Sequence, residues 1–416
     1  MSNSSRAKRI LDRDKFSDQF VTAIRVLRCL MIYIGIWPDK KNEKPYNLLW
    51  YFHSTMFLFL LSGLVCGLVV IRHDMNKVLS NLSVTSGLTY FIGKWFTFSW
   101  HKVLIKKLTY SMDEDWINLA NKTLIQASVP ESVQIMMKHY GSLNIYVYII
   151  LFALFIVDAN FIVDYVTATN HHDNLTDLYN MLPLTHSWYP GIDYDRDYII
   201  RFLAAAQILC TTSSFVISTA VDGFFVITVL HTTGQLEILG LFIERMKCDS
   251  PDSECHKTNI KEMVKRHQML LSVADDIQEC FGAITFMRVS ISLVGICTSA
   301  HTFLGELQKS EQGHVIALKY GFVSFTALAN VFVCCFVSDT LMSQGLAIRT
   351  HVYNSEWYNA TSSVNLSLSI VTIKSSQPII ISAAKIFPLT LQNFTVVIKS
   401  IASYISALRA MSVSHI

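Results

Sequence analysis

Residues Lys385–Met411 read KIFPLTLQNFTVVIKSIASYISALRAM, and this stretch indicates the fold most directly. Apart from Lys385, Lys399 and Arg409 it carries no charged residue. A helix needs about 20 apolar residues to cross the roughly 30 Å hydrocarbon core of a bilayer. The stretch therefore predicts a membrane-spanning helix near the carboxyl end of the chain.

Six further hydrophobic segments of comparable length precede this one. The chain has 51% hydrophobic and only 16% charged residues among 416, whereas charged residues make up about a quarter of an ordinary soluble domain. Each segment is long enough to span a bilayer as a helix. The seven predicted spans are 48–71, 82–100, 141–166, 198–230, 284–305, 315–338 and 379–411. The fold class that follows is an all-α membrane protein with seven transmembrane helices.

The distribution of Lys and Arg predicts how these helices are oriented. Cytoplasmic loops keep an excess of basic residues. With the amino terminus placed inside, the inner segments hold 23 Lys and Arg residues and the outer segments hold four. The four outer ones are Arg72, Lys77, Arg196 and Lys309. The sequence thus predicts a cytoplasmic amino terminus, seven crossings and an extracellular carboxyl terminus.

Two of the predicted cytoplasmic segments have the pattern of amphipathic helices. Apolar residues recur at helical spacing in 231–283, with charged residues between them, and 339–378 has a matching helical segment. Together they predict a helical cytoplasmic anchor bundle whose apolar face needs a partner, and a second subunit would serve as one. The expected parts are a cytoplasmic amphipathic lead-in at 1–47, transmembrane helices 1–4 at 48–230, an anchor loop at 231–283, helices 5–6 at 284–338, a second anchor segment at 339–378, helix 7 at 379–411 and an extracellular tail at 412–416.

The sequence lacks the motifs of several other protein classes. It has no Gly-rich phosphate loop, nucleophile elbow or His-Glu-x-x-His run, so we expect neither an enzyme nor a cofactor site. The run His171-His172-Asp173 and the pair Cys248 and Cys255 lack the further ligands of a metal site, and no metal is expected. A secondary transporter would be expected to show an internal repeat, and we see none in this sequence. A metabotropic seven-helix receptor would have its amino terminus outside, opposite to the orientation predicted here. We also expect no nucleic-acid partner.

Charged residues within the spans and one glycosylation sequon give two further predictions. A charge inside a span is costly and needs a partner. Asp222, near the inner end of the fourth span, and Arg288, near the inner start of the fifth, lie at similar depth and are predicted to form a structural ion pair. Asn174, in Asn174-Leu175-Thr176 of the predicted outer loop, is the best glycosylation sequon.

Small and weakly polar residues recur on one face of the seventh span. They are Ser400, Ser403, Ala407, Ala410 and Ser414. Such a stripe either packs against a neighbouring helix or lines a narrow pore. The residues alone favour packing, because small residues at helical spacing are the ordinary device of membrane helix contacts.

The carboxyl-terminal motifs resemble those of insect odorant receptors. The matching stretches are Trp357-Tyr358-Asn359, Lys374-Ser375-Ser376-Gln377-Pro378 and Ala384-Lys385-Ile386-Phe387-Pro388-Leu389. A gustatory receptor, the close alternative, would usually end its last helix with Thr-Tyr, five residues and Gln-Phe, where this chain has Ser403-Tyr404-Ile405-Ser406-Ala407-Leu408-Arg409. The olfactory co-receptor is longer and has a larger second cytoplasmic loop. The resemblance therefore implies a tuning subunit.

This resemblance implies a mechanism and a set of partners. Such a subunit assembles with co-receptor subunits as a heterotetramer in the plasma membrane of an olfactory neuron dendrite, in contact with lipid, and forms an odorant-gated, non-selective cation channel. The outer part of helix seven lines the pore, with matching positions centred on Ala407 and Ala410. A small volatile odorant binds in the outer half of the helix bundle. The implied pocket residues are Tyr90, Phe91, Val157, Phe161, Phe202, Ala206, Leu209, Tyr320, Val323 and Ser324.

Overall fold

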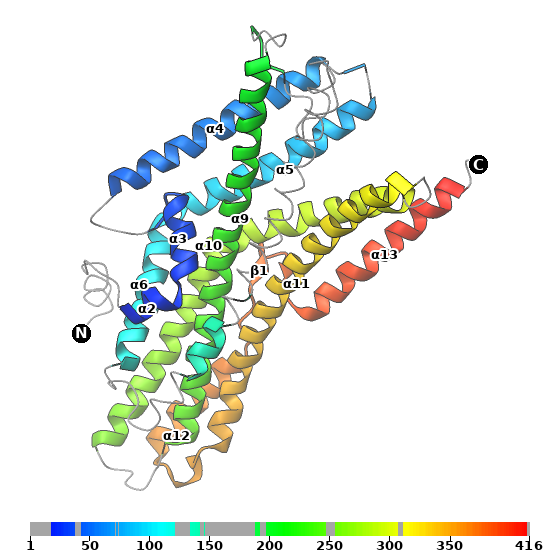
Figure 1. Cartoon of the computed structure of the whole chain (residues 1–416). Helices are drawn as coiled ribbons and strands as arrows, with labels where there is room; N and C mark the ends of the chain where they lie inside the picture. The colour runs from blue at the N-terminus through cyan, green and yellow to red at the C-terminus, as the bar shows by residue number, and fades with distance from the viewer. Residues whose placement is uncertain are drawn as a thin grey trace. The chain divides into compact units, whose positions relative to one another are not determined.

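The structure is a computed structural model that describes residues 18–37, 43–70, 72–73, 75–120, 134–141, 145, 188–191, 197–246, 254–306 and 311–413. These residues are almost entirely helical, as the sequence predicts (Figure 1). The chain forms two compact units. Unit 1 comprises Met1–Ala23, Val103–Leu143 and Phe225–Ile416, and unit 2 comprises Ile24–Lys102 and Asn144–Phe224.

Unit 2 is built on two long apolar helices and the first part of a third. They are α4 (Glu43–Val70), α5 (Met75–Trp100) and α9 (Asp197–Glu244) up to Phe224. The indole rings of Trp50 and Trp95 stack between α4 and α5 with centroids 5.2 Å apart. Phe98 of α5 packs edge-on against Phe224 of α9 at 5.7 Å. Aromatic contacts of this geometry add to the stabilisation that burial gives.

The amphipathic lead-in forms two short helices, α2 (Asp18–Ala23) and α3 (Arg25–Tyr33). Of the apolar positions predicted at helical spacing, Phe20, Ile24, Leu27 and Met31 are buried and Leu30 is half-buried. Gly35, at a φ of 74°, turns the chain at the end of α3, where a side chain would be strained. Most of the described residues of the lead-in are thus helical, while its extent and its place at the inner membrane surface stay predictions.

Unit 1 contains the remaining helices. They are α6 (Lys102–Ala120, from Val103), the helical residues 134–141, the end of α9, α10 (Glu254–Glu306), α11 (Glu311–Asn354), the 3-10 turn η1 (Trp357–Asn359), α12 (Ser362–Ser375) and α13 (Leu391–Val413). α10 and α11 pack along each other, and α13 packs against both (Figure 1). The segments 231–283 and 339–378 are largely helical, as their periodicity predicts, and their cytoplasmic location stays a prediction.

The predicted helix at 379–411 begins later than expected. Residues 379–390 instead form a short hairpin of β1 (Ser382–Ala383) and β2 (Phe387–Pro388), and α13 starts at Leu391. Ala384 and Lys385 at the hairpin tip have φ values of 50° and 60°. A non-glycine residue in this left-handed region costs roughly 1–2 kcal/mol. The apolar composition of the segment predicted a helix, but the chain turns back before the helix begins.

Four stretches of the described residues are long and apolar enough to cross a membrane. They are Leu48–Val70, Arg201–Glu244, Thr258–Cys297 and Ser324–Asn354. They overlap the first, fourth, fifth and sixth predicted spans. The second and seventh predicted spans are helical over most of their length, and the third, 141–166, lies almost entirely outside the described residues, as does Asn174. The number of crossings and the orientation of the termini therefore stay predictions.

Candidate functional site

Five of the predicted pocket residues lie in unit 2, on α5 and α9. They are Tyr90, Phe91, Phe202, Ala206 and Leu209. The rings of Tyr90 and Phe91 lie 5.4 Å apart, and Phe91 meets Phe215 of α9 edge-on at 5.7 Å. The spacing of the α9 residues places them on one face, where Phe202 is 66% and Leu209 is 45% exposed. The two helices thus bring an aromatic contact and an accessible apolar face to unit 2.

The other predicted pocket residues belong to unit 1 or lie outside the described part. The hydroxyl of Ser324 on α11 lies 2.7 Å from that of Ser299 on α10, so Ser324 already has a hydrogen-bond partner. Tyr320 and Val323 are on α11, but their side chains lie outside the description, as do Val157 and Phe161 altogether. That the ten residues form one pocket stays a prediction.

A buried ion pair joins α5 to α9 within unit 2. The Lys94 ammonium lies 2.5 Å from the Asp222 carboxylate, and both side chains are almost completely buried. Lys94 also donates to the Ser218 hydroxyl at 2.7 Å and to the Ser218 carbonyl at 3.3 Å. The Tyr90 ring lies over the ammonium, with its centroid 5.7 Å away. These contacts compensate the charge that Lys94 brings into the second predicted span.

The sequence predicts a different partner for Asp222, namely Arg288. Arg288 is buried on α10 in unit 1, where its guanidinium contacts the Cys334 thiol of α11. Asp222 belongs to unit 2. The Asp222–Arg288 pair stays a prediction, and Lys94 is a partner of Asp222 that sequence reasoning missed.

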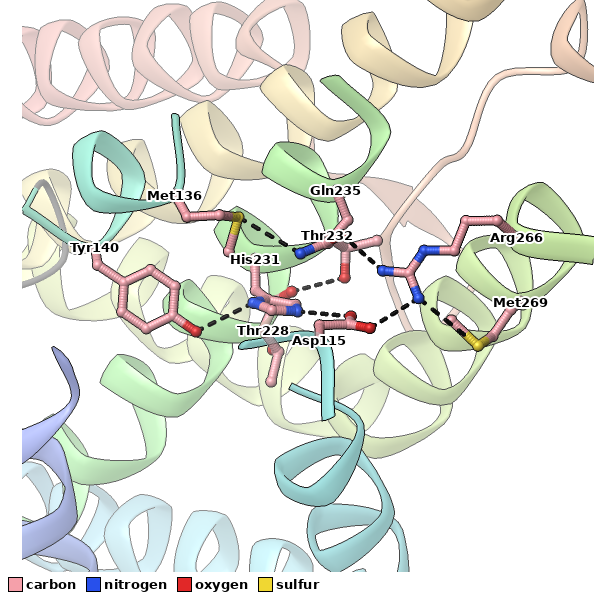
Figure 2. A network of polar contacts seen from close by, with 9 residues as sticks. All are labelled: Asp115, Met136, Tyr140, Thr228, His231, Thr232, Gln235, Arg266 and Met269. Atoms are coloured by element: carbon pink, nitrogen blue, oxygen red, sulfur yellow. Dashed lines mark hydrogen bonds and ion pairs between the residues drawn. The ribbon is translucent and has the colours of Figure 1, made fainter. Parts of the chain in front are cut away.

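A second buried polar network lies in unit 1 and centres on Asp115 of α6 (Figure 2). Arg266 of α10 donates to Asp115 at 2.8 Å and to the side-chain carbonyl of Gln235 at 2.6 Å. The Gln235 amide lies 3.7 Å from the sulfur of Met136. Burial by itself raises the pKa of Asp115, but the Arg266 guanidinium and the bond from His231 outweigh it, so this pKa lies well below its ordinary value.

His231 of α9 extends this network on its other side (Figure 2). Its Nε2 lies 3.0 Å from the Asp115 carboxylate, which only accepts hydrogen bonds, so Nε2 carries a proton. The Tyr140 hydroxyl lies 3.1 Å from Nδ1. Burial raises the pKa of Tyr140, so the phenol stays protonated. Asp115 is thus held by Arg266 on one side and by His231 on the other.

The network ties together four segments that are far apart in sequence. Asp115 and Arg266 are 151 residues apart, and Tyr140 and His231 are 91 apart. Sequence reasoning missed these residues because none of them forms a local motif. Their buried, paired arrangement indicates a structural role in fixing α6, the helical residues 134–141, α9 and α10 against one another.

The start of α13 is fixed by two hydrogen bonds. The backbone N–H of Leu391 donates to the Asp339 carboxylate of α11 at 3.2 Å. The N–H of Asn393 donates to the Thr390 hydroxyl at 3.2 Å, as in an ordinary amino-terminal cap. A carboxylate beside a helix amino terminus also interacts favourably with the helix dipole. α11 therefore sets the point from which the predicted pore helix extends.

The two faces of α13 have different surroundings. Val397 and Ile401 are buried against Ile296 of α10, next to Leu328 of α11 and Ile405. The predicted stripe lies on another face, where Ser400, Ser403 and Ala407 are exposed. The side chain of Ala410 and the whole of Ser414 lie outside the described residues. The first three positions of the stripe are therefore exposed in this chain, and packing against another subunit and lining a pore both stay predictions.

A family model and individual proteins that match this chain all belong to the odorant receptors. The family model described as 7tm Odorant receptor matches residues 74–402. Odorant receptor 13a of Drosophila melanogaster is 26% identical over 247 residues, which is 54% of this chain and 54% of that protein. The odorant receptor coreceptor of Aedes aegypti is 24% identical over 153 residues, 36% of this chain and 31% of that protein. This chain thus spans about half the length, or less, of these relatives in the alignments.

The fold also matches solved structures. The insect olfactory receptor OR5 from Machilis hrabei in complex with eugenol superimposes with a TM-score of 0.78 at 14% sequence identity. The match covers 95% of this chain and 100% of the OR5 chain. A second structure of OR5 gives a TM-score of 0.73 at 16% identity, over 94% and 99% of the two chains. At such low identity the likeness establishes a common fold.

Proposed function

The chain belongs to the 7tm odorant receptor family, and from this premise we propose that it is a tuning subunit of an odorant-gated, non-selective cation channel. The family match covers residues 74–402 and identifies a helical membrane receptor of insect olfaction. Relatives include both an odorant receptor and a co-receptor, which supports assembly with co-receptor subunits. The plasma membrane is the location that this function requires.

The observation that carries the proposal is the asymmetry of α13. Its apolar face packs through Val397 and Ile401, while Ser400, Ser403 and Ala407 stay accessible. A face of small and weakly polar residues leaves room for ions and water when several copies of a helix surround one axis. The packed face would hold α13 on its own subunit, and the stripe would face the shared pore.

An exposed apolar face on α12 supports assembly with other subunits. Leu366, Ile370 and Ile373 follow one another at helical spacing and are all exposed, whereas Val364 and Leu368 are buried. Contiguous exposed apolar surface marks a site of protein association. In the proposed channel, this face would be covered by the equivalent region of a neighbouring subunit.

The proposed odorant site uses the aromatic contact between α5 and α9. Tyr90 and Phe91 supply ring surface there, and Phe202 and Leu209 supply accessible apolar area. Burying each methylene of a volatile ligand stabilises the complex by about 0.8 kcal/mol. The ligand opens the channel only to the extent that it binds the open state better than the closed state.

Cysteine accessibility tests the pore assignment. Ser403→Cys and Ala407→Cys are expressed with the co-receptor, and a charged, thiol-specific reagent is applied with and without odorant. We expect progressive block of the current that is faster while the channel is open. The control is Ala402→Cys, because Ala402 is exposed on α13 but lies outside the stripe. Equal block at Ala402 and Ala407, or none at either stripe position, would remove the stripe from the pore.

A further inference from the structure

A cluster of aromatic residues in unit 2 surrounds His53 of α4. The rings of Tyr33 and Trp95 lie 5.1 Å and 6.5 Å from the imidazole, centroid to centroid, and the Trp95 ring is nearly perpendicular to it at 79°. Phe57 lies 6.4 Å away on the same helix. His53 is 1% and Trp95 3% exposed, so both are shielded from solvent. The cluster joins the end of α3 to α4 and α5.

The contacts of His53 determine its protonation. Nε2 lies 3.2 Å from the backbone carbonyl of Tyr33, which only accepts hydrogen bonds, so Nε2 carries a proton and donates it. A second proton would place a charge among aromatic rings, which is unfavourable without a carboxylate partner. Nδ1 is therefore an unprotonated acceptor. Among the described residues it has no hydrogen-bond partner.

Trp95 presents the complementary group. Its indole Nε1–H can only donate, and this buried atom also has no partner in the described part of the chain. The neighbouring Trp50, stacked on Trp95, does have one, because it donates to the Ser99 hydroxyl at 3.2 Å. Buried polar groups are nearly always hydrogen-bonded in proteins. The cluster thus contains one orphan donor and one orphan acceptor on adjacent rings.

We propose that a single hydroxyl group binds between Trp95 and His53, accepting a hydrogen bond from Nε1–H and donating one to Nδ1. A hydroxyl is the smallest group that satisfies both at once, and two or more polar partners are what a buried water requires. The hydroxyl belongs either to a water molecule or to the head of a small membrane amphiphile. This inference does not depend on the proposed channel function.

The bound hydroxyl would have a structural consequence for the lead-in. His53 holds the end of α3 through the Tyr33 carbonyl, and the hydroxyl would extend this connection to Trp95 on α5. The chain of hydrogen bonds would then run from α3 through α4 to α5. Removing the His53 side chain, the middle of this chain of hydrogen bonds, would loosen the attachment of the lead-in to α4 and α5.

The direct test is a high-resolution density map of the purified full chain in the assembly that it forms. We expect an isolated peak within hydrogen-bonding distance of both nitrogens, which identifies water. A peak that continues into an elongated tail identifies an amphiphile and also supports the site. Empty space between the rings, or a direct Trp95–His53 hydrogen bond, overturns the proposal.

Two matched variants add a second readout, the thermal midpoint, to the density map. Trp95→Phe and Trp50→Phe remove the same atoms from neighbouring, stacked rings. If the hydroxyl is bound, Trp95→Phe removes the peak and lowers the thermal midpoint at least as much as Trp50→Phe, which leaves the peak in place. A smaller loss for Trp95→Phe would mean that its N–H had no partner to lose, and the proposal would fail.

Discussion

The Lys94 ammonium on α5 lies 2.5 Å from the Asp222 carboxylate on α9, and both are shielded from solvent within unit 2. Breaking a buried pair by removing one partner typically costs about 3–5 kcal/mol, because the other charge stays buried. Asp222→Asn and Lys94→Met should each lower the thermal midpoint and the amount of protein at the cell surface. The double variant removes both charges, so its thermal midpoint should fall by less than the sum of the two single decreases. Additive losses would contradict this account of the pair.

The Asp115 carboxylate should make stability depend on pH in the acid range. Its folded pKa lies below the unfolded value, which is about 3.9 for Asp, because Arg266 and His231 outweigh the effect of burial. The stabilisation is therefore complete above the unfolded pKa and is lost as pH falls through the folded pKa.

We expect Asp115→Asn to lower the free energy of unfolding by about 3–5 kcal/mol at neutral pH. The difference from the unsubstituted protein should stay constant from neutral pH down to about 5 and shrink below about 4. Denaturant titrations in detergent at several pH values measure this. A difference that already disappears between pH 7 and 5 would show that another group controls the network.

A bulky residue in the stripe of α13 should obstruct conduction. Ala407 is exposed and on the stripe, so Ala407→Trp should reduce the single-channel conductance several-fold while the subunit still assembles at the surface. Ala402→Trp is the matched control, because Ala402 is exposed on a different face of the same helix. Unchanged conductance in Ala407→Trp, at normal surface levels, would place the pore elsewhere.

The aromatic contact between α5 and α9 should influence odorant sensitivity. Phe91 meets Phe215 edge-on at 5.7 Å, and it is a predicted pocket residue. Removing a ring that contacts the ligand loses about 1.5–3 kcal/mol, so Phe91→Ala should raise the half-maximal odorant concentration by about ten-fold or more. Dose-response curves measure the shift, with the ion permeability ratio as a second readout.

Phe96→Ala is the control for this prediction, because Phe96 is on the same helix but is 53% exposed and outside the predicted pocket. It should leave the half-maximal concentration nearly unchanged. Equal shifts for both variants, or an altered permeability ratio in Phe91→Ala, would count against the pocket assignment.

Local patterns in the sequence were sufficient to predict most of the helices. Long apolar runs predicted α4 and the first two-thirds of α9, and helical periodicity predicted the buried positions Ile260, Met263 and Leu270 of α10. The hairpin at 379–390 was not predictable in this way. Its left-handed tip is made of Ala384 and Lys385, which are not turn-forming residues, and its surroundings are apolar enough to read as part of a helix.

Local sequence patterns could not predict the buried polar contacts, for a different reason. Gln278 of α10 holds the backbone of Ser382 in the hairpin by hydrogen bonds of 2.7 Å and 2.9 Å across 104 residues, and Lys94 reaches Ser218 across 124. Periodicity shows which face of a helix is buried but not which distant residue it meets. The stripe could be predicted from sequence because its members follow one another at helical spacing within one short stretch.

Whole-cell recording from cells that express this chain with and without an insect co-receptor tests the central claim most directly. Odorants are applied in rapid pulses, and G-protein signalling is blocked throughout. The account predicts a fast cation current that needs both subunits and survives the block. A response that disappears under the block, with both subunits at the cell surface, would contradict a ligand-gated channel and indicate a metabotropic receptor.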